Sequence, residues 1–500
     1  MFDSSVPEPS QLAGLSDAEL IDAAAVTTRA ENAACARKLA IMAELFIRRT
    51  GLPPDERELW WVDPEAAVSA EIAAAHNITS GLALHQTHRG VALRERLPKV
   101  AALFFAGLIT DLLVREIVSR TYLVDRPALM AALDADLAAE ILGWGPLSVK
   151  KTRTRIDDLV ERHDPGALRK ARAGENQRSV SFGNPTDAPG FTSVNAVMFN
   201  CDAATAERNL TQMVYSVCDS DPRTIEERRN DAFAAIQAGL TALACRCGAD
   251  DCEAAARPTP LRDTTIYVLT DATTPTEETA DAAAAPEPKR RRRTPVLAET
   301  RSGYVFGAGI MPAPLLQGLL DGAKYREIIH PGQAGAEPGR FPSRALADFI
   351  RCRDLTCRFP GCDKPATDAD IDHTVPHPVG PTHPSNLKCL CRFHHLLKTF
   401  WVGATGWRDR QYPDGTIVWT APTGHTYTTQ PGSRLLHPTL CRPTATLWTG
   451  DSPRTEPSDR RGKQMPRRRN TRAYNRRRAV TAERTLNDPL VADRNKPPPL

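Results

Sequence analysis

The stretch CRFPGCDKPATDADIDHTVPHPVGPTHPSNLKCLCRFHHLLKTFW, Cys357–Trp401, concentrates four cysteines and five histidines. Cys357 and Cys362 form one pair, and Cys391 and His394 form a second pair with two residues between them. Two such pairs joined by a loop can close a tetrahedral zinc site. The spacing therefore predicts a structural Zn2+ on these four side chains. Cys352 or Cys389 could replace one ligand, and a set of buried thiols without metal is the alternative.

A second set of polar side chains in this stretch is not needed for the zinc ion. It comprises Asp372, His373, Asn386 and His395. Because adjacent residues on a helix point about 100° apart, His394 can face the zinc while His395 faces a different site. Asp372 and His395 offer one oxygen and one nitrogen ligand to a divalent ion such as Mg2+ or Mn2+. His373 then suits a general base for water, and Asn386 suits a residue that orients it.

The segment ADIDHTVPHPVGPTHPSNLKCLCRFHHLLKT, residues 369–399, resembles an HNH endonuclease with the ββα-metal fold. The three letters of that motif fall on His373, Asn386 and His395. The resemblance implies that His373 activates water, that Asn386 positions it, and that Asp372 and His395 bind the catalytic divalent ion. It also implies a zinc knuckle on the two Cys/His pairs, and hydrolysis of DNA phosphodiester bonds.

The resemblance extends over most of residues 15–430. A helical N-terminal part, with DPRTIEERRNDAF at 221–233 and CRCGADDC at 245–252, precedes the HNH segment. This order is similar to the 13E12 repeat family, which joins a helical domain of unknown function to an HNH nuclease. One departure lies before Asn386, where the family's Gly-Gly is Val379-Gly380. Since valine does not readily adopt a positive φ, we expect this loop to be shifted.

Two alternatives to an active nuclease stay open. One is a non-catalytic DNA- or protein-binding module that keeps the zinc knuckle. The other is a degenerate nuclease carried by a mobile element.

The length of 500 residues predicts several domains, because one ordinary core does not extend over so long a chain. The expected fold class is a mainly α N-terminal domain plus a small α+β HNH domain. The predicted boundaries are a helical domain at 15–270, a disordered acidic and basic linker at 271–295, a small sheet and helix connection at 296–340, the HNH domain with its zinc knuckle at 341–430, and a disordered basic tail at 431–500.

Neither a secretory signal nor a membrane span is predicted. The N-terminal segment has no basic region followed by an apolar one. The longest apolar run, Val100–Val114, is interrupted by Asp111 and predicts a buried helix. We therefore expect a cytoplasmic protein without a membrane partner. In a reducing compartment its 12 cysteines are better read as metal ligands or buried thiols than as disulfides.

Three more cysteines, Cys245, Cys247 and Cys252, could bind a second zinc ion with a ligand from elsewhere in the chain. A turn with free thiols is the alternative.

Basic residues are the remaining candidates for DNA contact. Lys289–Arg293 and Arg467–Arg478 can neutralise phosphates, or they can keep flexible segments soluble. Lys398 follows His395 by three residues, on the same face of a predicted helix. We therefore treat Lys398 as a candidate phosphate-binding residue, with a plain surface lysine as the alternative.

Overall fold

A computed structural model of the chain describes residues 7–50, 56–169, 179–183, 187–188, 191–258, 268–269, 302–313, 316, 326–453, 465–494 and 496. The chain divides into two compact units. Unit 1 combines Met1–Lys170 with Glu327–Leu500, and unit 2 is Ala171–Arg326. The predicted linker at 271–295, with its basic run Lys289–Arg293, lies outside the described residues.

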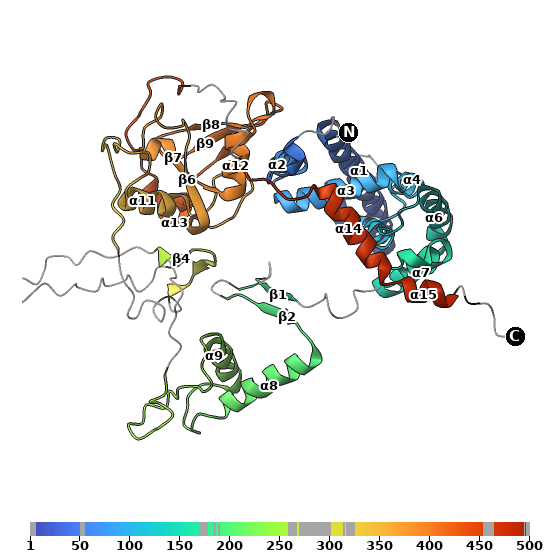
Figure 1. Ribbon diagram of the computed structural model, residues 1–500, viewed down its shortest axis with the longest axis horizontal. Helices are drawn as coiled ribbons and strands as arrows, with labels where there is room; N and C mark the ends of the chain where they lie inside the picture. Colours follow the sequence, from blue (N-terminus) through green and yellow to red (C-terminus); the bar gives the residue numbers. More distant parts are fainter. Residues whose placement is uncertain are drawn as a thin grey trace, which may run out of the picture. The chain divides into compact units, whose positions relative to one another are not determined.

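The N-terminal part of unit 1 is a bundle of helices around one core (Figure 1). Ser16 and Glu19 form a capping box at the start of α1, because the backbone N–H of each donates to the side chain of the other. Leu39, Phe104 and Leu133 are fully buried in the shared core. The helices are α1 (Asp17–Thr50), α2 (Pro64–His76), α3 (Ser80–Glu95), α4 (Pro98–Phe105), α5 (Asp111–Arg120), α6 (Pro127–Glu140) and α7 (Val149–His163).

The apolar run Val100–Val114 forms parts of two helices instead of the single buried helix that we expected. Helix α4 ends at Phe105 and α5 begins at Asp111. Gly107 between them has φ +74°, and a Cβ there would lie 2.3 Å from the carbonyl oxygen of Arg29. Only glycine fits this close approach, so the chain turns there. Among the described residues, no helix has the length and apolarity needed to cross a membrane.

The C-terminal part of unit 1 contains small antiparallel sheets and short helices. Strands β6 (Ala369–His373) and β7 (Leu387–Cys391) pair antiparallel, with Asp372 opposite Lys388, and α12 (Arg392–Phe400) follows directly. Strands β8 (Arg408–Gln411), β9 (Ile417–Thr420) and β10 (Thr426–Thr429) form a second sheet. Helices α11 (Arg344–Asp354) and α13 (Ser433–Leu436) complete this part. A mainly helical N-terminal part followed by small sheets agrees with the predicted fold class.

Helix α2 and the C-terminal part share one hydrophobic core. Trp60, Val62 and Ala70 are buried in the same cluster as Trp401 and Trp419. The Trp401 indole N–H donates to the carbonyl oxygen of Val62 over 2.9 Å. We expected these residues to lie in two domains, 15–270 and 341–430. Their joint core instead makes them parts of one compact unit.

The end of the chain differs from the disordered basic tail expected at 431–500. Within that range the structure forms α13, α14 (Arg472–Thr485) and α15 (Asp488–Arg494). Arg472 pairs with Asp63, and Arg476 pairs with Glu65, near the start of α2. The arginine run thus finds acidic partners far away in sequence, which composition alone does not reveal.

The described elements of unit 2 include a hairpin, two helices and a small sheet. Strands β1 (Ser179–Phe182) and β2 (Val194–Val197) interrupt the stretch that we predicted to be helical. Helices α8 (Asn200–Val214) and α9 (Ile225–Gln237) pack together around Met213 and Leu243. Strand β3 (Val268–Leu269) pairs with β4 (Gly303–Val305), which pairs with β5 (Gly309–Met311).

Candidate functional site

The structure brings Cys357, Cys362, Cys391 and His394 into one group, with ligand atoms all within 4.8 Å of one another. The Cys362 and Cys391 sulfurs are 4.0 Å apart, and His394 Nδ1 lies 3.3 Å from the Cys391 sulfur. A tetrahedral zinc ion would separate two sulfurs by about 3.8 Å and a sulfur from a nitrogen by about 3.6 Å. The four side chains therefore fit a structural metal such as zinc.

Local structure explains how the second ligand pair is positioned. Cys391 ends β7 and is the N-cap of α12, so His394 follows in the first helical turn. The His394 ring stacks on Phe359 with centroids 3.9 Å apart. Burial raises the pKa of the Cys357 thiol well above its usual range. A thiolate at that position therefore requires a nearby cation.

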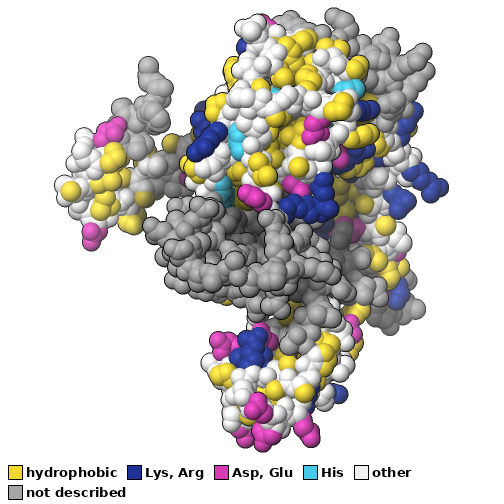
Figure 2. All heavy atoms as spheres, turned by 90° about the vertical axis from the view of Figure 1, so that its left-hand side faces the viewer, with side chains coloured by type: hydrophobic (Ala, Val, Ile, Leu, Met, Phe, Trp, Pro, Cys, Tyr) yellow, Lys and Arg dark blue, Asp and Glu magenta, His cyan; other side chains and the backbone are white. Residues whose placement is uncertain are grey.

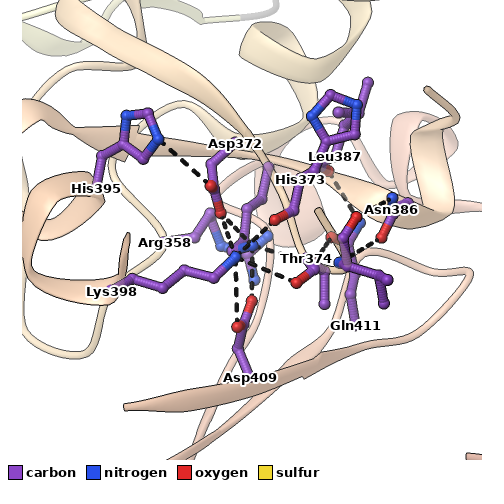
Figure 3. A network of polar contacts seen from close by, with 12 residues as sticks. Arg358, Asp372, His373, Thr374, Asn386, Leu387, His395, Lys398, Asp409 and Gln411 are labelled. Carbon is purple, nitrogen blue, oxygen red and sulfur yellow. Dashed lines mark hydrogen bonds and ion pairs between the residues drawn. The ribbon is translucent and has the colours of Figure 1, made fainter. Parts of the chain in front are cut away.

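Asp372 belongs to a buried network of two carboxylates and two lysines (Figure 3). Its Oδ2 lies 2.7 Å from Lys388 Nζ and 2.6 Å from Lys398 Nζ. Asp409 completes the network, 2.7 Å from Lys388 Nζ and 3.4 Å from Lys398 Nζ. Burial alone would raise the pKa of Asp372, but Lys388, Lys398 and His395 outweigh it and hold the pKa well below its usual range. Asp372 is therefore an anion at neutral pH.

His395 faces the other oxygen of Asp372. Its Nε2 is 3.5 Å from Asp372 Oδ1, and its Nδ1 is 2.8 Å from Asp370 Oδ2. Because Asp370 accepts a hydrogen bond from Nδ1, the proton of a neutral His395 ring lies on Nδ1. The lone pair on Nε2 then points toward Asp372. His394 and His395 thus serve two different groups of side chains, as their adjacency on a helix predicts.

His373 ends β6, and its ring leaves the strand away from the lysine network (Figure 3). Its Nε2 is 2.9 Å from the Thr382 hydroxyl oxygen. That hydroxyl donates its one proton to the carbonyl oxygen of Gly339, at 2.5 Å, so it accepts from His373. Burial lowers the pKa of His373 to about 4, although Asp372 opposes the shift. The neutral ring therefore carries its proton on Nε2 and offers Nδ1 as a base.

Asn386 holds the loop that follows β6. Its Oδ1 accepts from Val375 N at 2.8 Å, and its Nδ2 donates to the carbonyl oxygens of Val375 and Pro381. A Cβ on Gly380 would lie 2.6 Å from Asn386 Nδ2. Val379 is half exposed and is not among the non-glycine residues with positive φ. Val379 therefore avoids the positive φ that valine disfavours, and Gly380 occupies the crowded position.

Comparisons with known proteins place the chain in a family. Residues 26–354 match the family described as "Domain of unknown function (DUF222)". The chain belongs to the DUF222 family. Two proteins of Mycobacterium tuberculosis, named uncharacterized protein Rv2100 and uncharacterized protein Rv3776, are each 45% identical to it. These alignments cover 100% of this chain and 93% and 95% of the relatives. No solved structure matches it significantly.

The DUF222 match ends at Asp354, three residues before Cys357. The Cys/His group and the network around Asp372 therefore lie outside the matched range. The family description and the relatives' names assign them no activity.

Lys398, our candidate phosphate-binding residue, belongs to the network around Asp372. Its ammonium group donates to Asp372 and to the carbonyl oxygen of His373, and only 10% of its side chain is exposed. Several arginines of Arg467–Arg478 are likewise paired within unit 1. On the face in Figure 2, basic side chains are scattered among acidic and hydrophobic ones and form no continuous band among the described residues.

Sequence reasoning missed Thr382, Asp370, Lys388 and Asp409 at this site of the DUF222 protein. Lys388 carried a usable signal, because it interrupts the apolar strand LKCLC, and a charge there needs a partner. Thr382 and Asp409 lie in other segments, and no spacing rule connects them to the motif.

Proposed function

We propose that this DUF222 protein is a metal-dependent HNH endonuclease that hydrolyses DNA phosphodiester bonds. The observation that carries the proposal is the pair formed by His373 and Asp372 at the end of β6. His373 is a neutral imidazole whose Nδ1 makes no hydrogen bond to the described residues. Asp372 is a carboxylate that faces His395. A strand pair followed by a helix supports all three residues, as in the ββα arrangement that the HNH resemblance implies.

In this proposal His373 Nδ1 takes the proton of the attacking water. Thr382 holds the opposite nitrogen and so sets the ring orientation and the tautomer. Asn386 keeps the following loop in place through its hydrogen bonds to Val375 and Pro381.

Asp372 Oδ1 and His395 Nε2 are the atoms that would hold a divalent ion, because both are directed at the same region. Asp370 orients His395 from behind, the usual role of a carboxylate next to a metal-binding histidine. When bound, Mg2+ or Mn2+ would supply positive charge for the phosphate oxygens and the leaving group.

The proposal is tested by nicking of supercoiled plasmid with purified full-length protein, with and without Mg2+ or Mn2+. His373→Ala should reduce nicking by at least about 100-fold, the usual range for loss of a general base. His425→Ala is a matched control, because His425 is an exposed histidine on the β9–β10 turn. Cleavage by His373→Ala at the wild-type rate would reject the proposed mechanism.

One observation favours a second candidate, a zinc-stabilised DNA-binding module without catalysis. Asp372 Oδ2 is already bound by two ammonium groups, which lowers the charge that it can offer to a divalent ion. This candidate predicts no metal-dependent nicking and DNA binding that survives Asp372→Asn. Gel-shift titrations of both proteins at two salt concentrations, run beside the nicking assay, separate the two functions.

A further inference from the structure

Four cysteines of unit 2 form a cluster that the proposed nuclease site does not use. They are Cys218, which follows α8, and Cys245, Cys247 and Cys252, which follow α9. Their sulfurs all lie within 4.8 Å of one another. The sequence alone did not identify a fourth ligand for Cys245, Cys247 and Cys252. In the folded chain this ligand is Cys218, which lies 27 residues before Cys245.

The distances fit a metal better than a disulfide. The Cys218 and Cys245 sulfurs are 3.4 Å apart, and every described cysteine is free. A disulfide bond needs about 2.05 Å, whereas two sulfurs on one tetrahedral zinc ion lie about 3.8 Å apart. A set of four sulfurs within one such sphere is the ligand set of a closed structural zinc site.

The two loops that carry the cysteines are fixed by contacts independent of any metal. Asp221, whose side chain is fully buried, accepts a hydrogen bond from the backbone N–H of Arg246 at 2.9 Å. Arg223 donates to the carbonyl oxygen of Ala244 at 2.8 Å. Arg257 donates to the carbonyl oxygens of Ser216 and Leu243. The cluster is therefore preorganised, because both loops are held in register next to their cysteines.

The arginines of these loops also bind carboxylates. Arg223 pairs with Asp221 and with Asp231, each at 2.7 Å, and Arg246 pairs with Asp231 at 3.1 Å. These ion pairs add to the contacts that hold both loops next to the cysteines.

The small core of this unit gives such an ion a structural role. The described hydrophobic cluster between α8 and α9 has four buried side chains, Met213, Ala232, Ala235 and Leu243, and two of them are alanines. A core of this size contributes little hydrophobic free energy, and small folds compensate with disulfides or a structural metal.

We propose that Cys218, Cys245, Cys247 and Cys252 bind a second structural zinc ion, which holds the loops after α8 and α9 together. This site is separate from the Cys/His group of unit 1 and does not depend on the proposed nuclease function.

The test is the metal content of the purified full-length protein, measured by inductively coupled plasma mass spectrometry. Wild type should hold two zinc ions per chain, and Cys218→Ser and Cys362→Ser should each hold one. Cys201→Ser is the matched control, because Cys201 is an exposed thiol on α8 outside the cluster, and it should keep two.

Folding is followed separately for each unit. All seven tryptophans belong to unit 1, so tryptophan fluorescence should be unchanged in Cys218→Ser, while limited proteolysis within 200–258 should accelerate. The number of zinc ions bound per wild-type chain tests the proposal even if the Cys218→Ser variant unfolds. The proposal would be overturned by a zinc content that is the same in wild type and in Cys218→Ser, by iron in place of the second zinc, or by a Cys218–Cys245 disulfide in peptide mass mapping.

Discussion

Replacing Lys388 by methionine tests whether the buried charges around Asp372 compensate one another. Methionine keeps most of the side-chain volume and removes the ammonium group. Lys388 has no exposed side-chain surface, and its Nζ is 2.7 Å from both Asp372 Oδ2 and Asp409 Oδ2. In wild type two cations face two anions. In Lys388→Met one cation, Lys398, remains for both carboxylates.

The expected loss follows from the burial of the remaining charges. Removing one partner of a buried ion pair costs about 3–5 kcal/mol, because the other charge is left uncompensated. Lys398 still contacts Asp372 at 2.6 Å, so we expect the lower end, about 3 kcal/mol. In Lys388→Met/Asp409→Asn one anion again faces one cation. This double variant should recover about 2 kcal/mol of the free energy of unfolding that Lys388→Met loses, because substitutions of contacting residues are not additive.

The loss should also depend on pH in a defined direction. In wild type the pKa of Asp372 is lowered, so its stabilisation is complete above its ordinary value of 3.8 and constant between pH 5.5 and 8. In Lys388→Met a carboxylate without its partner has a raised pKa. The free-energy cost of burying this charge is largest above that pKa, and it falls with the pH because the carboxylate becomes protonated. The deficit of the variant should therefore shrink from pH 8 to pH 5.5.

Urea unfolding followed by tryptophan fluorescence measures these differences. Trp419 is a suitable reporter because it is fully buried and its ring lies 5.8 Å from Lys388 Nζ. Lys150→Met, at an exposed position on α7, is the control and should change the free energy of unfolding by less than about 0.5 kcal/mol. A loss below about 1 kcal/mol for Lys388→Met, or a deficit independent of pH, would refute the reasoning.

Three further predictions concern other parts of unit 1. Burial would raise the pKa of Glu65, but His88 and Arg476 lower it to about 2, so its stabilisation is present above the ordinary value of 4.5 and is lost as the pH falls. Between pH 5 and pH 3, urea titrations should show wild type losing about 1–2 kcal/mol more than Glu65→Gln, after allowance for solvent screening of Arg476. Gly380→Ala should lower the free energy of unfolding by about 3 kcal/mol in the same assay, because the new Cβ would lie 2.1 Å from a carbonyl oxygen, whereas Val379→Gly should change little. Burial lowers the pKa of His373 to about 4, so the plasmid-nicking rate should change less than about threefold from pH 7.5 to pH 5.5, where a base of pKa 6.5 would lose about tenfold.

Features encoded by local spacing could be predicted from the sequence. The capping box of Ser16 and Glu19 and the turn at Pro413–Gly415 each depend on residues a few positions apart. The grouping of the two Cys/His pairs follows from the same kind of rule, because each pair lies within five residues.

Features created by distant segments could not be predicted in this way. Thr382 reaches His373 because the loop folds back on the end of β6, and Cys218 reaches its cluster because α8 packs on α9. The basic end of the chain has a composition typical of disorder, yet Arg472 becomes ordered against Asp63. Such pairings depend on tertiary proximity, and a single sequence carries no periodic signal for them.

The interleaving of the two ends of the chain has a consequence for biosynthesis. Helix α2 is made early, but its core partners Trp401 and Trp419 and its ion-pair partner Arg472 emerge from the ribosome several hundred residues later. Unit 2, Ala171–Arg326, is complete before that and can fold first. The core that α2 shares with the C-terminal part therefore forms only near the end of translation. Until then the apolar face of α2 that carries Ala70 and Ala74 has no native cover, and nascent chains that stall before residue 401 become natural substrates for chaperones and proteases.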